Sequence, residues 1–168
     1  MLDWTLDGVL AAQVDRVVVT APPAAPELVA AIVAARPDAD RVTVVPGGAT
    51  RQESVALALA TIAPAEVVLV HDAARPLTPS GLFDLVRAAV VATGAGVVPA
   101  LAPADTIKQL DGTAVVATLD RSRLAAVQTP QGFPAGELQR AYAVAGTGHT
   151  DDASVFSAAG GALSLIHI

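Results

Sequence analysis

The chain has 168 residues, of which 53% are hydrophobic and 15% charged, and its formal net charge at pH 7 is -6. This composition excludes a disordered chain, because disorder requires low hydrophobicity and high net charge. The acidic balance argues against a nucleic-acid-binding protein, and the absence of cysteine excludes disulfides, thiol catalysis and cysteine-based zinc sites. The length suits one domain with a hydrophobic core.

The mean hydropathy of +0.56 raises the question of a membrane span. The longest uncharged stretch, residues 88–104, contains two glycines and two prolines and falls short of the roughly 20 strongly apolar residues that a spanning helix needs. No secretory signal pattern opens the chain. We therefore predict a cytoplasmic protein with no membrane partner.

The first hundred residues alternate between helical and strand patterns. The predicted elements are, in order, a helix at 2–12, a strand at 17–19, a helix at 25–35, a strand at 41–45, a helix at 50–62, a strand at 66–70, a helix at 79–93 and a strand at 96–101. Thr50 or a neighbour is expected to cap its helix, and Thr78 is expected to cap the helix that starts at Pro79. This alternation predicts an α/β fold, with a mostly parallel sheet and helices on both faces.

An inserted hairpin is predicted next. Two β-prone runs, 106–110 and 113–118, flank Asp111-Gly112, a hairpin turn in which both residues would need positive φ. Beyond it, Thr129-Pro130-Gln131 is expected to form a fixed turn that presents a hydroxyl and an amide. A helix should follow at 134–144, and Thr150-Asp151-Asp152 is a good helix start with acids in its first turn.

Both ends of the chain depart from the usual α/β pattern. The chain begins inside an amphipathic helix and stops at 163–168, which resembles half a strand. An α/β domain normally opens with a strand that carries its main phosphate loop. We therefore expect a single domain, residues 1–168, that is incomplete at both ends.

The most informative motif is the hexapeptide at residues 71–76, His-Asp-Ala-Ala-Arg-Pro, which directly follows a buried strand. Ligands bind beyond the carboxyl ends of strands in such sheets. Asp72 could bind Mg²⁺ or a sugar hydroxyl, and Arg75 a phosphate. The alternative is a surface Asp–Arg pair in a turn, but the position at a strand tip favours a functional site. His71 is expected to be packed or hydrogen-bonded rather than catalytic.

Three other motifs have a plain structural interpretation. The turn Gly47-Gly48 leads into a helix start, where exposed amides favour an anion or a nucleotide base. Taken alone, it is better explained as an ordinary turn with a solvated Arg51. Arg121 and Arg123 are equally consistent with a phosphate contact and with a solvated face. Residues 150–152, taken alone, are best explained as a capped helix.

In combination, six segments in this order resemble the 2-C-methyl-D-erythritol 4-phosphate cytidylyltransferases of the non-mevalonate isoprenoid pathway. The matching segments are Gly-Gly-x-x-Arg-x-x-Ser (47–54), His-Asp-Ala-Ala-Arg-Pro (71–76), Asp-Thr-Ile-Lys (105–108), Arg-x-x-Leu (121–124), Gln-Thr-Pro-Gln-x-Phe (128–133) and Thr-Asp-Asp-Ala-Ser (150–154). No single segment is decisive, but six in register are specific and cover nearly the whole chain.

The resemblance implies a Rossmann-like homodimer whose hairpin arm, residues 103–124, interlocks two subunits. It implies transfer of CMP from CTP to methylerythritol phosphate, with Mg²⁺ as cofactor and Asp72 as a candidate metal ligand. Ala49 stands where the family often has Asp. Arg121 would be catalytic, positioning the acceptor phosphate from the neighbouring subunit, which Thr106 would also reach. The implied nucleotide-binding residues are Gly47, Gly48 and Ser54, and the implied substrate-binding residues are Asp72, Ala73, Arg75, Thr106, Thr129 and Thr150.

The family's glycine-rich loop with an arginine, its Pro-Lys pair and a later strand lysine have no counterpart in this chain. We therefore expect the 168 residues alone to be nearly inactive. Two alternatives remain open. One is a ribitol-5-phosphate cytidylyltransferase, which shares much of the pattern, although Ala73-Ala74 and the run 128–131 favour the erythritol enzyme. The other is a non-catalytic α/β binding module.

Overall fold

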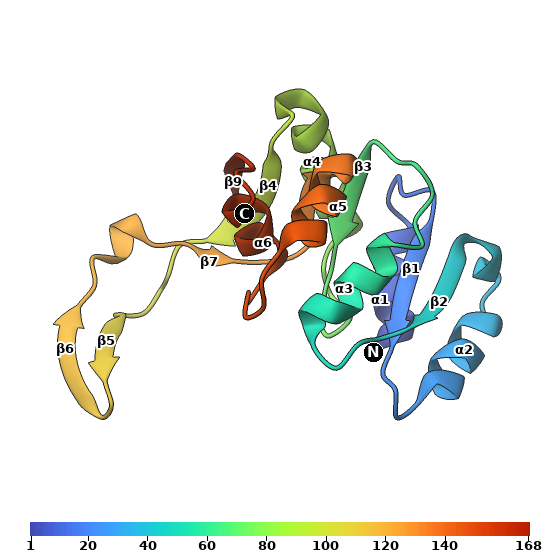
Figure 1. Cartoon of the computed structure of the whole chain (residues 1–168), viewed down its shortest axis with the longest axis horizontal. Coiled ribbons are helices and arrows are strands. Elements are labelled where there is room, and N and C mark those ends of the chain that lie inside the picture. Colours follow the sequence, from blue (N-terminus) through green and yellow to red (C-terminus); the bar gives the residue numbers. More distant parts are fainter.

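The computed structural model describes all of residues 1–168 and shows a layered body from which a hairpin arm projects (Figure 1). Each helix lies close to the position that hydrophobic periodicity predicts. The α-helices are α1 (Leu2–Leu10), α2 (Pro26–Ala34), α3 (Arg51–Leu59), α4 (Ser80–Thr93), α5 (Ala135–Val144) and α6 (Asp152–Ala158). Short 3-10 turns, η1 (Ala39–Arg41) and η2 (Arg121–Arg123), complete the helical elements.

The strands form one parallel pair, one larger mixed sheet and the isolated hairpin. The strands are β1 (Val17–Ala21), β2 (Val42–Pro46), β3 (Val67–Val70), β4 (Gly96–Leu101), β5 (Lys108–Asp111), β6 (Ala114–Thr118), β7 (Ala126–Val127), β8 (Gln131–Pro134) and β9 (Leu163–His167). β1 pairs with β2 and β4 with β9 in parallel, whereas β8 lies antiparallel between β3 and β4. The α/β prediction is confirmed, with β7 and β8 as the antiparallel exceptions.

Two helical layers cover the strands, and successive residues of β4 show this directly. Val97 packs with Val86 and Val90 of α4, whereas Val98 packs in a cluster with α3, α5 and α6. Because neighbouring side chains of a strand point to opposite faces, α4 and the α5–α6 pair lie on opposite sides of the sheet. α1 packs against α2 and α4, and α3 against α5, which extends the two layers.

The strand β8 differs from the prediction, since Gln131 was expected to belong to a turn at 129–131 and no strand was predicted after it. The turn does exist at the cis peptide between Thr129 and Pro130, but the chain then enters the sheet. Gly132 explains how it fits: a Cβ there would lie 2.6 Å from Val86 Cγ1 of α4. Phe133, on the other face, is fully buried against Phe156 with ring centroids 5.1 Å apart.

β1 and β3 each have one strand edge without a partner. β1 pairs only with β2, and β3 only with β8. Between them runs a groove of about 1710 Å³ whose walls come mainly from α1, β1, α3 and β3. The parallel pair is therefore held to the rest of the body by helix packing and by side chains at the carboxyl edge, not by a continuous hydrogen-bonded ladder.

Two local predictions were wrong in detail. Thr78 does not cap α4; its hydroxyl donates to the Arg75 carbonyl at 3.1 Å, and the N-cap position is Pro79. The hairpin loop is Gly112-Thr113, because Asp111 pairs with Ala114, and only the glycine has positive φ (58°). A glycine at the first loop position is the requirement of a type II′ turn. No helix combines the length and apolarity needed to cross a membrane.

Candidate active site

Three loops meet beyond the carboxyl ends of β1 and β2, which form the parallel pair, and of β3, which belongs to the larger sheet. We call this region the carboxyl edge. The amide of Gly47, after β2, donates to the carbonyl of Ala21 at the end of β1 at 2.8 Å. Arg51, in the first turn of α3, contacts Asp72, which follows β3. The carboxyl ends of these strands therefore lie together, which is where α/β proteins place ligands.

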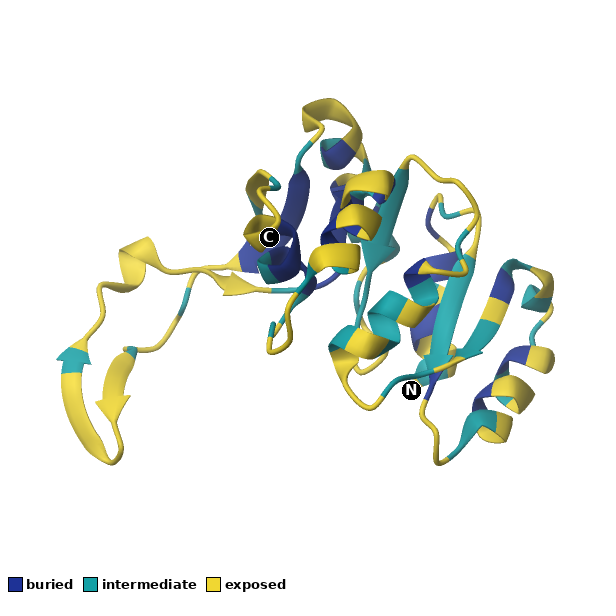
Figure 2. Ribbon diagram, viewed as in Figure 1, coloured by how far each residue is buried: buried dark blue, intermediate teal, exposed yellow.

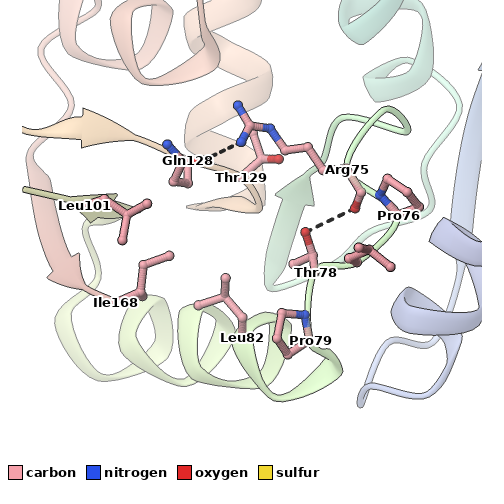
Figure 3. Close-up of a pocket in the computed structure, with 10 residues that line it drawn as sticks. Arg75, Pro76, Thr78, Pro79, Leu82, Leu101, Gln128, Thr129 and Ile168 are labelled. Carbon is pink, nitrogen blue, oxygen red and sulfur yellow. Dashed lines mark hydrogen bonds between the residues drawn. The ribbon is translucent and has the colours of Figure 1, made fainter. Parts of the chain in front are cut away.

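Asp72 lies between two guanidinium groups. Its Oδ1 accepts from Arg51 Nε at 3.1 Å, and its Oδ2 lies 3.5 Å from Arg75 Nε. Arg75 Nη1 also donates to Gln128 Oε1 (Figure 3). No hydrogen bond within the protein engages Arg75 Nη2, so this arginine keeps donors for a ligand while its position is fixed on two sides.

A buried carboxylate holds the other end of Arg51. Asp152 is completely buried, and its Oδ2 accepts from Arg51 Nη2 at 2.7 Å. Its Oδ1 accepts from the Tyr142 hydroxyl at 2.6 Å. Burial alone would lower the pKa of Arg51, but the ion pairs with Asp152 and Asp72 outweigh it and raise the pKa above its usual value.

The same ion pair affects Tyr142. Burial raises the pKa of its phenol, and the negative charge of Asp152 raises it further. The phenol therefore stays protonated and acts as the donor to Asp152.

The neighbouring acid has a separate structural role. Asp151 caps α6 by accepting from the Ser154 amide at 2.9 Å, so the capped helix start predicted at 150–152 is confirmed. It also accepts from Gln131 Nε2 at 2.9 Å, while Gln131 Oε1 accepts from the Ala153 amide. Burial would raise the pKa of Asp151, but these hydrogen bonds lower it overall. These hydrogen bonds join strand β8 to the residues on either side of Asp152 in the sequence, at the start of helix α6.

His71 and Thr129 connect this edge to the turn before β8. The His71 Nδ1 lies 2.9 Å from Thr129 Oγ1, and its Nε2 lies 3.3 Å from the Arg75 carbonyl. The ring also packs edge-on against Phe83. Burial lowers the pKa of His71, so the neutral ring donates from Nε2 and accepts at Nδ1 from the threonine hydroxyl. The prediction that His71 is packed and hydrogen-bonded is confirmed.

The Gly47-Gly48 turn is internally satisfied. The Gly48 amide donates to Ser54 Oγ at 3.0 Å, and the Ala49 amide donates to Glu53 Oε2 at 2.7 Å. Thr50 caps α3 as expected, accepting from the Glu53 amide. A Cβ at Gly48 would lie 2.3 Å from Glu53 Cβ. Packing therefore explains this glycine, and the two loop amides are not free for an anion.

A pocket of about 350 Å³ opens beside Arg75 (Figure 3). This volume lies at the lower end of the range of small-molecule sites. Arg75, Gln128 and Thr129 supply its polar wall, and Leu82 and Leu101 part of its apolar wall.

The remaining predicted site residues lie around this cluster or away from it. The Ala73 carbonyl accepts from Thr5 Oγ1 at 2.8 Å, which ties the loop to α1. Thr150 is exposed and directly precedes the cap Asp151. Thr106 and Arg121 lie on the arm and make no contact with the cluster within one chain; Arg121 Nη1 donates to the Ala104 carbonyl at 2.5 Å.

The residues present do not build a metal site. No group of three or more acidic or histidine side chains is arranged to hold an ion. Asp72, the predicted ligand, has one oxygen paired with Arg51 and the other near Arg75. Mg²⁺ is usually bound by one or two carboxylates together with substrate phosphates. Because arginines engage the one predicted carboxylate, the side chains as arranged do not fit the ion, and we assign it no catalytic step.

Sequence reasoning missed the central role of Arg51. It was expected to be solvated, yet it bridges two carboxylates from different loops. Residues 150–152 predict a capped helix only, although Asp151 alone makes the cap and Asp152 is buried. One acid is enough to cap a helix, so the second acid, Asp152, was the signal in the sequence that this segment has a further role. Nothing local marks Tyr142, the only tyrosine of the chain, as its partner.

Fold and geometry together define an α/β domain whose candidate site lies beyond the carboxyl ends of its strands. The family described as "IspD: 2-C-methyl-D-erythritol 4-phosphate cytidylyltransferase" matches residues 1–167. The chain therefore belongs to this family, as its motifs predicted.

Curated relatives agree. A bifunctional IspD/IspF enzyme of Clavibacter michiganensis is 49% identical over 171 residues, covering 99% of this chain and 42% of the relative. A 2-C-methyl-D-erythritol 4-phosphate cytidylyltransferase of Saccharopolyspora erythraea is 54% identical over 132 residues, covering 74% of this chain and 58% of the relative. The chain thus spans about half the length of these two proteins.

Solved structures show the same fold. The crystal structure of 2-C-methyl-D-erythritol 4-phosphate cytidylyltransferase from Thermus thermophilus superposes with a TM-score of 0.82 at 35% identity, covering 99% of this chain and 77% of that one. The bifunctional IspDF from Campylobacter jejuni gives a TM-score of 0.78 at 26% identity, covering 99% of this chain and 41% of that one.

Proposed function

We propose that this family member transfers CMP from CTP to 2-C-methyl-D-erythritol 4-phosphate. An oxygen of the acceptor phosphate attacks the α-phosphorus of CTP, a new P–O bond forms, and the bond to the β-phosphate oxygen breaks to release pyrophosphate. The observation that carries the proposal is Arg75: its guanidinium stands at the strand tip beside a pocket, with donors not used by the protein. Arginine forks suit phosphate oxygens.

The acceptor site is proposed to lie around Arg75, with Asp72, Ala73, Thr129 and Thr150 as its other residues. The polar side chains converge from the loop after β3 and the turn before β8, while apolar side chains form part of the pocket wall. Such a mixture suits a sugar alcohol with one charged end. Positioning and charge neutralisation supply most of the rate acceleration in phosphoryl-type transfers.

The cytidine is proposed to lie over Gly47, Gly48 and Ser54, on the opposite side of Arg51 from the acceptor. Since the Gly48 and Ala49 amides are occupied within the turn, the contact would use the half-buried backbone of the two glycines rather than these amides. The family suggests Mg²⁺ as cofactor, and the substrate phosphates would have to provide most of its ligands.

We further propose a homodimer in which the arm reaches the neighbouring subunit. Thr106 and Arg121 are too remote from the Asp72–Arg75 cluster to contact it within one chain, whereas a partner's arm could place them there. Arg121 would then position the acceptor phosphate. The cytoplasmic location stays a prediction from the sequence.

A substrate test separates the proposal from its alternatives. Acceptor binding is measured by calorimetry with methylerythritol phosphate, ribitol 5-phosphate and inorganic phosphate, and pyrophosphate release is measured with CTP and each acceptor. Release with the erythritol acceptor supports the function and contradicts the expected low activity of the 168 residues. Tighter binding of that acceptor without pyrophosphate release supports both the proposed acceptor and the expected low activity of the 168 residues.

The other outcomes decide between the alternatives. Preference for ribitol 5-phosphate supports the ribitol enzyme. No discrimination among the three ligands, together with no release, supports a binding module and overturns the proposal.

A further inference from the structure

Arg51 connects the two halves of the site. Its Nε donates to Asp72 at 3.1 Å and its Nη2 to Asp152 at 2.7 Å. Asp72 belongs to the loop after β3, Asp152 to the start of α6, and Arg51 itself to the first turn of α3. One guanidinium therefore fixes three elements that the backbone ladder does not join.

The Asp152 end of this bridge is rigid. Asp152 has no solvent exposure, and both its oxygens are occupied, one by Arg51 and one by the Tyr142 hydroxyl. A buried carboxylate that loses a partner is costly, because water cannot replace it. The Asp72 end is half-buried, with about a third of each side chain exposed. The buried Asp152 thus fixes the position of Arg51, and Arg51 in turn restrains the more exposed Asp72.

Asp72 competes with ligands for Arg75. Its second oxygen lies 3.5 Å from Arg75 Nε, so a small rotation would let the carboxylate take two Arg75 donors at once. Carboxylates and phosphates compete for this bidentate geometry. By holding one oxygen of Asp72, Arg51 prevents that rotation.

We propose that Arg51 is a positioning residue, anchored by Asp152 and Tyr142, that holds Asp72 away from Arg75 so that Arg75 can receive the acceptor phosphate. The inference rests on the proposed function in one respect, the identity of the phosphate ligand. Arg51 needs no contact with the ligand. Its effect on affinity passes entirely through Asp72 and Arg75.

A purely electrostatic role predicts different results. If Arg51 only added positive charge, Arg51→Lys and Tyr142→Phe would leave phosphate affinity unchanged. Asp152→Asn would then strengthen binding, because it removes a negative charge near the site. The positioning role predicts weaker binding for all three variants, since each loosens the Arg51 anchor without lowering the positive charge.

The experiment measures binding of inorganic phosphate to the 168-residue chain by NMR titration, well below the unfolding temperature of each variant. We expect Arg51→Lys and Asp152→Asn to weaken binding by about tenfold, the scale of a lost charged hydrogen bond. Tyr142→Phe should weaken it by about threefold only, because it leaves the ion pair between Arg51 and Asp152 in place. Arg140→Gln is the control, because it removes an exposed arginine of α5 and should leave affinity within about twofold.

Affinity of the folded protein separates positioning from stability alone, which would move the melting temperature only. The inference is overturned if Asp152→Asn binds phosphate as tightly as the unaltered chain or more tightly. Should Asp152→Asn not fold, unchanged affinity in Tyr142→Phe and Arg51→Lys overturns it equally. The inference is also overturned if the unaltered chain does not bind phosphate at millimolar concentrations.

Failure of the proposed function has a different signature. In that case phosphate binds and responds to the Arg51 variants as expected, but methylerythritol phosphate binds no better than inorganic phosphate and supports no pyrophosphate release. The positioning role would then stand for another phosphate ligand.

Discussion

The carboxyl edge of the sheet and the arm use the same residue type in opposite surroundings. Arg51 bridges a fully buried and a half-buried carboxylate, whereas Arg121 on the arm is exposed and donates to a single carbonyl. No residue of 103–124 is buried (Figure 2). The edge is organised within one chain, but the arm presents its cations and apolar side chains outward.

This difference separates a region that is packed within one chain from a region whose apolar side chains stay exposed. A lone two-stranded hairpin is marginally stable, and the arm exposes Leu110, Val115 and Val116 by 55% to 59%. Contiguous exposed apolar side chains commonly mark interaction sites. The edge, in contrast, stands on a packed core. Substitutions should therefore change the free energy of unfolding strongly in the core that supports the edge and weakly on the arm.

The largest expected effect is in the core beneath the edge. Phe133→Ala removes a fully buried ring that packs on Phe156. We expect the free energy of unfolding to fall by about 3–5 kcal/mol, measured by urea denaturation. Phe133→Leu is the matched control and should lose clearly less. A loss below about 1 kcal/mol for the alanine variant would show that this part of the core is loosely packed.

At the edge itself, Arg75→Ala should act on binding. The substitution removes the proposed phosphate donor, and a charged hydrogen bond contributes about 1.5–3 kcal/mol. Acceptor affinity should therefore fall about tenfold or more, measured by calorimetry. Because the Arg75 side chain is 42% exposed, its loss should change unfolding by no more than about 0.5 kcal/mol. Unchanged acceptor affinity would remove Arg75 from the site.

Acidification should weaken the edge through His71. Burial keeps the pKa of its ring below that of the unfolded chain, so between about pH 7.5 and 5.5 the unfolded state takes up the proton first. The free energy of unfolding should then decrease as pH falls through this window, and the decrease should level off below the pKa of the folded state. The comparison is with His71→Gln in the same buffers. Identical pH dependence in both proteins would contradict the assignment.

How much of this was predictable depends on how local the cause is. Periodicity and caps located every helix, and the Thr50 cap was recovered because its partner Glu53 is three residues away. β8 was missed since its short run Gln131-Gly132-Phe133-Pro134 is typical of a turn. Its strand conformation comes from pairing with β3 and from α4 packing over Gly132.

The site divides in the same way. The strand-tip position of Asp72 and Arg75 follows from local sequence. The bridge from Arg51 to Asp152 spans 101 residues, and Tyr142 reaches Asp152 from another helix. No local pattern encodes such contacts, because they depend on how α3, α5 and α6 stack over the sheet.

The smallest effect on unfolding is expected on the arm. Val115→Ser and Val116→Ser change exposed side chains, so the free energy of unfolding of the isolated chain should shift by less than about 0.5 kcal/mol.

If the arm packs on a second subunit, the double variant should weaken self-association, measured by sedimentation over a concentration series, because apolar area is lost at the interface. Val144→Ser on α5, exposed by 76%, is the control and should leave association unchanged. An unaltered dissociation constant in the double variant would place the interface elsewhere, and a large loss of stability without any self-association would show that the arm packs within its own chain.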